Sequence, residues 1–136
     1  MRIIVVLSIC LLSTVAVAED SLSDSSLLSY PGDGKTYTFH VSGERLLKTP
    51  IWAADADNPP LPPRKAQALA VQCYKKLGLR LDDWMVESIE LEDAGDALHW
   101  LYVVHFREHP SIGRALRFSV IVLMDRTVAE CTVTSK

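Results

Sequence analysis

The feature that most constrains this chain is the regular placement of large apolar residues at every second position in its second half. In residues 98–107 this set is Leu98, Trp100, Tyr102, Val104 and Phe106. Residues 115–124 repeat the pattern. Successive side chains of a strand point to opposite faces, so this period predicts two strands with one face on a core. Residues 36–41, 84–91 and 127–133 predict further strands, and a change of parity predicts a bulge near Glu87-Ser88.

One long helix is predicted from Pro62-Pro63 to about Leu77. Apolar residues recur there at spacings of three and four, which places them on one side of a helix: Ala66, Leu69, Ala70, Cys73, Tyr74 and Leu77. Proline suits the first turn, and Gly78 suits the position after the last. With the short connectors between strands, this order predicts an α+β domain in which one long helix packs on a four- to five-stranded antiparallel sheet.

The start of the chain predicts a targeting signal followed by a flexible leader. Residues 1–18 combine Arg2, an apolar run and small residues ending at Ala18, the pattern of a secretory signal peptide. We therefore expect cleavage after Ala18, a secreted or periplasmic location and no stable membrane anchor. Residues 19–35 are rich in Ser and Asp without a sustained period, which predicts a flexible leader. A single domain is expected over residues 36–136.

Charge and length exclude several classes of protein. The chain has 136 residues and a net charge of −3, so it lacks the basic character of a nucleic-acid binder and the length of a multidomain enzyme.

Two of its three cysteines, Cys73 and Cys131, lie beyond the leader. An even pair in an exported chain predicts a disulfide between the helix and the last strand. Two inert buried thiols remain the alternative.

The alternate positions of the strands predicted over residues 98–107 and 115–124, which point away from the core, form a candidate partner face. It contains Leu101, Val103, His105, Arg107, Arg117, Ile121 and Leu123. Its apolar members could form an exposed patch for a protein partner or for a homodimer through the sheet face or edge. We favour the other interpretation, in which the Pro-rich segment of residues 49–63, with Ile51 and Trp52, covers these apolar side chains. The charged members could form a cross-strand ionic surface with Glu87, Glu90, Glu92 and Arg114.

No residue set predicts catalysis, a metal or a cofactor. His99 and His105 share a strand face but stand six residues apart, too far to bind one metal. Ser119 lies on the candidate partner face, and no pattern identifies a base for it. The motifs of hydrolases, zinc peptidases and phosphate-binding loops are missing from the sequence. We therefore expect no enzyme.

The element order over residues 36–134 resembles small exported domains of the cystatin-like and PepSY-like kind. Four segments are also similar to uncharacterised exported proteins of the planctomycete group: Trp52…Pro59-Pro60-Leu61…Ala66, Trp84…Ile89-Glu90-Leu91, Trp100-Leu101-Tyr102-Val103-Val104 and Val122-Leu123-Met124-Asp125. Those proteins often have Gly after Met-Asp, where this chain has Arg126, so we expect a different turn. The Q-x-V-x-G hairpin of inhibitory cystatins is missing, and the likeness implies no activity.

The leading hypothesis is a secreted or periplasmic binding or interaction domain, inhibitory or accessory to a sensor, for a protein partner or a small ligand. One alternative is a small enzyme or ligand carrier with a cone-shaped pocket, as in nuclear-transport-factor-like folds. Another is a structural subunit that assembles through its sheet. A deep polar pocket holding His105 or a buried carboxylate would favour the enzyme.

Overall fold

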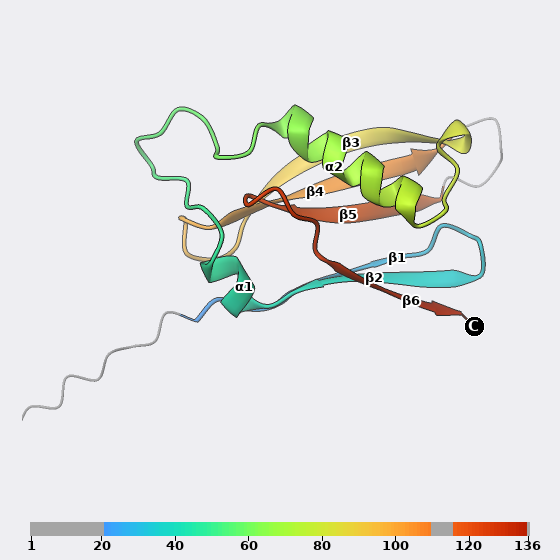
Figure 1. The fold of residues 1–136 in the computed structure, drawn as a ribbon, viewed down its shortest axis with the longest axis horizontal. Coiled ribbons are helices and arrows are strands. Elements are labelled where there is room, and N and C mark those ends of the chain that lie inside the picture. The colour runs from blue at the N-terminus through green and yellow to red at the C-terminus, as the bar shows by residue number, and fades with distance from the viewer. Residues whose placement is uncertain (1–20, 110–115, 136) are drawn as a thin grey trace, which may run out of the picture.

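A computed structural model describes residues 21–109 and 116–135 (Figure 1). The signal-peptide pattern of residues 1–18 and Arg114 lie outside this range. The described residues form the strands β1 (Ser25–Ser29), β2 (Lys35–Val41), β3 (Trp84–Asp93), β4 (Trp100–Glu108), β5 (Arg117–Leu123) and β6 (Glu130–Ser135), the helices α1 (Gly43–Leu47) and α2 (Pro63–Lys76), and the 3₁₀ turn η1 (Leu81–Asp83). Within these ranges, no helix has the length and apolar character needed to cross a bilayer.

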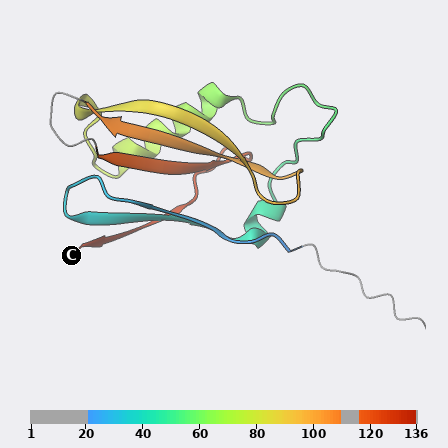
Figure 2. The ribbon, with the colours of Figure 1, turned by 180° about the vertical axis from the view of Figure 1, so that it is seen from behind.

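The strands form two three-stranded antiparallel sheets, sheet A in the order β1-β2-β6 and sheet B in the order β3-β4-β5 (Figures 1 and 2). The expected fold, one long helix on a single four- to five-stranded sheet, is therefore wrong. The described chain is mostly β, and its 14-residue helix α2 packs mainly on β4 and β5 of sheet B.

The two sheets separate because β6 changes partner. The chain after β5 turns back and bonds to it only near the turn, through Leu123 N to Thr127 O at 2.8 Å and Ala129 N to Ile121 O at 3.0 Å. From Glu130 onward it pairs with β2 instead. In the turn, Arg126 has a φ of 69°, the left-handed conformation that glycine adopts without strain.

Strand β1 lies within residues 19–35, where the sequence predicts a leader without sustained structure. It pairs with β2 from Ser25 opposite Val41 to Ser29 opposite Tyr37. Its inward positions are Ser25, Leu27 and Ser29, so two of three are polar. That composition explains why no apolar period marks the strand.

The free edge of β5 rests on the inner face of sheet A. Phe118 and Ser119 are consecutive and point to opposite faces of sheet B, yet both contact sheet A. The Phe118 ring lies 5.4 Å from that of Tyr37 and 5.8 Å from that of Phe39. The Ser29 hydroxyl accepts from Ser119 N at 2.9 Å and donates to Ser119 O at 3.3 Å. One hydroxyl thus satisfies two backbone groups on the free edge of β5, the N–H and the C=O of Ser119.

The core fills the angle between α2, sheet B and sheet A. Tyr74 of α2 stacks on Phe106 at 5.0 Å and meets Phe118 edge-on at 5.3 Å. Phe118 therefore touches both sheets and the helix. The bulge predicted near Glu87-Ser88 is confirmed, since the register of β3 on β4 shifts between Val86 and Ser88.

Candidate functional site

The outer face of sheet B, turned away from α2, holds most of the residues predicted for a partner face. The register brings them into rows across the three strands. Val103 stands between Glu90 and Ile121, and Leu101 stands between Glu92 and Leu123. The four apolar side chains of these two rows are buried, with exposures from 0 to 5%. No exposed apolar patch therefore exists at these four positions.

The cover over this face comes from the N-terminal strand. Residues 24–27 and the outer face of sheet B enclose a groove of about 360 Å³, lined by Asp24, Ser25, Ser26, Leu27, Glu90, Glu92, Leu101, Val103, His105 and Ile121. The Pro-rich segment, expected to provide the cover, does not line it. Ile51 is 52% exposed, and Trp52 packs on Trp100 at 5.5 Å between ring centres.

The groove has an apolar floor and an acidic rim. Asp24, Glu90 and Glu92 supply three carboxylates, and His105 supplies the one basic side chain among the lining residues. Asp24 is held in place because its Oδ1 accepts from Gly43 N at 2.8 Å. Its other oxygen lies 3.8 Å from His40 Nε2. No ion pair engages Glu92 in the part of the chain that the structure describes.

His105 links the groove to β5. Its Nδ1 lies 2.7 Å from Ser119 Oγ, and its Nε2 lies 3.5 Å from Glu90 Oε1. A serine, a histidine and a carboxylate thus lie in series across three strands. Sequence reasoning placed Ser119 and His105 on one face but could not pair them, because the turn between β4 and β5 leaves the register undetermined from sequence.

Ser119 is engaged through both its side chain and its backbone. It is 8% exposed, its hydroxyl lies 2.7 Å from His105 Nδ1, and its backbone N–H donates to Ser29 Oγ. An acyl-transfer site needs free N–H donors near the hydroxyl to stabilise the developing oxyanion. The backbone N–H of Ser119 is therefore not free to act as such a donor.

The far end of the same face carries the predicted arginines. Arg107 pairs with Arg117 across the β4–β5 ladder. Arg117 Nε lies 3.3 Å from Glu87, which confirms part of the expected ionic surface, although Arg117 is 72% exposed. Arg107 NH2 contacts Met85 sulfur at 3.7 Å. Such exposed pairs contribute little to affinity or stability by themselves.

No family model matches the chain, and no curated protein or solved structure is similar to it. Its activity therefore has to be inferred from its own geometry.

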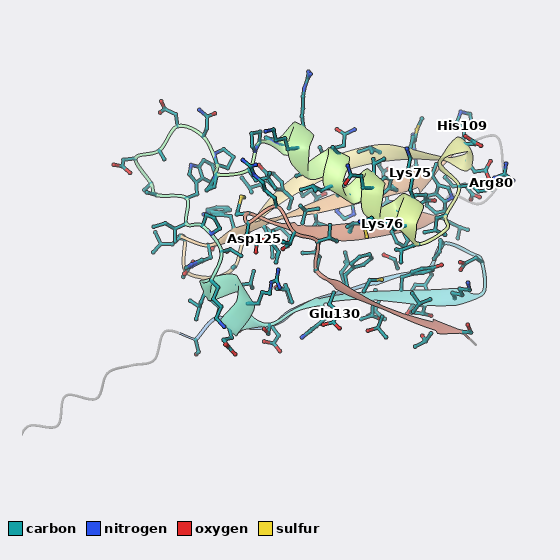
Figure 3. All side chains as sticks on the ribbon, in the orientation of Figure 1. Lys75, Lys76, Arg80, His109, Asp125 and Glu130 are labelled. Atoms are coloured by element: carbon teal, nitrogen blue, oxygen red, sulfur yellow. The ribbon has the colours of Figure 1, made fainter. Side chains whose placement is uncertain are left out.

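The other candidate sites among the described residues offer weaker evidence of a function. Among the described residues, no group of three or more His, Cys, Asp or Glu side chains is placed to hold a metal ion. A wider hollow of about 690 Å³ is lined by α2 alone, from Arg64 to Lys75, and is the solvent side of one helix. Figure 3 shows Lys75 and Lys76 on α2, with Arg80 beyond its end. These cations complement the negative end of the helix dipole.

The predicted disulfide partners are free thiols in the structure. Cys73 and Cys131 are both partly buried and both pack against the main core. Cys73 belongs to α2, which packs on the face of sheet B opposite the groove, and Cys131 belongs to β6 of sheet A.

Proposed function

We propose that this chain is a binding domain that holds a small amphiphilic cation, an aliphatic amine, in the groove between β1 and the outer face of sheet B. The observation that carries this proposal is the combination of an apolar floor with a carboxylate rim in one partly open groove. Its volume, about 360 Å³, lies at the lower end of the range for small-molecule sites.

Each half of such a ligand has a matching surface. An aliphatic chain would lie between Leu27 of β1 and the side chains of Leu101, Val103 and Ile121, and would take up the small exposed area that β1 leaves on them. An ammonium group would donate charge-assisted hydrogen bonds to the carboxylates of Glu90 and Glu92, and such bonds are about twice as strong as neutral ones. An anion of the same shape would meet the carboxylates and be repelled. The pattern of residues 1–18 supports a secreted or periplasmic place for this binding.

A small enzyme is the second candidate, favoured by the contact between His105 and Ser119. The backbone N–H of Ser119 already donates to Ser29 Oγ, which does not favour an enzyme at this site. The two candidates differ in one measurable property: a fluorophosphonate should label a nucleophilic serine and should leave a structural Ser119 unmodified.

The binding proposal is tested with three probes of equal chain length, hexylamine, hexanol and hexanoate. We expect chemical-shift changes with hexylamine at Leu101, Val103 and Ile121, weaker changes with hexanol and none with hexanoate. Replacing Glu90→Gln and Glu92→Gln together should weaken hexylamine binding about tenfold, since two charge-assisted bonds are lost.

Glu130→Gln is the matched control, because Glu130, labelled on β6 in Figure 3, is an exposed carboxylate that does not line the groove. It should bind hexylamine like the wild type. Equal binding of hexanoate and hexylamine, or an unchanged affinity in the double variant, would contradict the proposal.

A further inference from the structure

The two core cysteines flank one aromatic cluster from different elements. Cys131 stands opposite Phe39 in the β2–β6 ladder, so both side chains share the inner face of sheet A. Cys73 precedes Tyr74 in α2. The Tyr74 ring lies 5.3 Å from Phe118, which in turn lies 5.8 Å from Phe39. The two cysteines thus adjoin Phe39 and Tyr74, two rings that both meet Phe118 edge-on.

Each of the two elements lies on the same side of its own sheet in the views. Figure 1 shows α2 in front of β5 and β6 in front of β2, and the reverse view of Figure 2 shows α2 behind β5 and β6 behind β2. The thiols are also close enough to interact electrostatically, because Cys73 raises the pKa of Cys131 in addition to the larger effect of burial, which together bring it to about 11. Burial likewise raises the pKa of Cys73, against a smaller opposing effect of Lys76.

We propose that Cys73 and Cys131 are the site of a disulfide that joins α2 to β6 and braces the two sheets where β6 leaves β5. The bond forms by exchange with a low-molecular-weight disulfide as oxidant. One thiol loses its proton and attacks the donor, which releases one thiol. The second cysteine then loses its proton, attacks the mixed disulfide and releases the second. Two cysteines are oxidised and one donor disulfide is reduced to two thiols.

A disulfide between β6 and α2 would restrain the two sheets relative to each other. Beyond Ala129, β6 is held by β2 alone and has no backbone pairing to sheet B. A covalent link from β6 to the helix that packs on sheet B would hold both sheets on one core. It would also close a loop of nearly sixty residues, which restricts the unfolded chain strongly. A rise in Tm of about 10 °C or more is expected on oxidation.

The test uses the full chain with Cys10→Ser, so that only the two core thiols remain. After equilibration in a buffer of oxidised and reduced glutathione, the protein should be two hydrogens lighter. Tryptic digestion without reduction should join the peptides 66–75 and 127–136, which contain Cys73 and Cys131. Further replacement of either cysteine by Ser should abolish both the cross-link and the rise in Tm.

Two results would overturn the proposal. One is that both thiols stay free, or carry glutathione separately, under oxidising conditions in which the protein is folded. The other is that the cross-link forms but leaves Tm unchanged, which would show that it does not brace the sheets. The mass measurement does not depend on the stability of the Ser variants, so a variant that folds poorly still leaves a clear result.

Discussion

Asp96 organises the turn between β3 and β4 through several short contacts. Its Oδ1 accepts from Leu98 N at 2.9 Å and His99 N at 2.7 Å, while its Oδ2 lies 2.6 Å from His99 Nδ1. Burial alone would raise the pKa of Asp96, but the hydrogen bonds from His99 and Leu98 outweigh it and lower the pKa to about 2. The folded state therefore favours the ionised carboxylate.

The pH dependence follows from that shift. Because the pKa is lower in the folded chain than its ordinary value of 3.8, the stabilisation is fully present above about pH 4 and is lost as pH falls toward 2. Asp96→Asn should lower the free energy of unfolding by about 1 kcal/mol at pH 6, allowing for solvent screening, and by little at pH 2. Urea unfolding from pH 2 to 6 measures the difference. Asp57→Asn, in an exposed loop, should follow the wild type, and a constant gap between Asp96→Asn and wild type would contradict this origin.

Among the elements, α1 fixes the wall of the groove. Gly43 begins α1, and a Cβ built on it would collide with the carbonyl oxygen of Leu22. The chain before β1 can pass so close only because this position has no side chain. Gly43 N also donates to Asp24, so α1 holds both the path of residues 22–24 and one rim carboxylate.

Gly43→Ala should therefore displace residues 22–24 and open the groove. We expect weaker binding of hexylamine and faster amide exchange at position 43, with a loss of about 1–3 kcal/mol in stability. Titration and hydrogen exchange measure the two effects. Gly78→Asn is the control, since nothing lies within 4 Å of a Cβ there and Asn tolerates its φ of 77°. Normal binding by Gly43→Ala would show that residues 22–24 are not a wall of the site.

Sequence predicted individual elements better than their partners. The apolar period of α2 and the alternation of β4 and β5 depend on local spacing, and the structure has these elements near the expected bounds. The pairing of Cys131 with Phe39 depends on residues far apart in the chain, so alternation alone gave its face and not its neighbour. Strand β1 was missed because Ser25 and Ser29 occupy inward positions. Since β1 also covers the outer face of sheet B, the groove was missed with it.

In the whole molecule, one buried ring contacts both sheets and the helix. Phe118 contacts Tyr37 and Phe39 of sheet A, Phe106 of sheet B and Tyr74 of α2. It is fully buried. Because this side chain contacts both sheets and the helix, loss of its packing should destabilise both sheets together. Neither sheet should therefore unfold alone.

Phe118→Ala should thus lower the free energy of unfolding by about 3–5 kcal/mol, and Phe118→Leu by less. Tryptophan fluorescence reports sheet B through Trp84 and Trp100, while amide exchange at Phe39 reports sheet A. The two signals should shift together in both variants. Val133→Ala, at a position 43% exposed on β6, should change stability by much less. If Phe118→Leu made sheet A exchange freely while the fluorescence transition stayed in place, the sheets would be separate units, and the shared ring would not couple them.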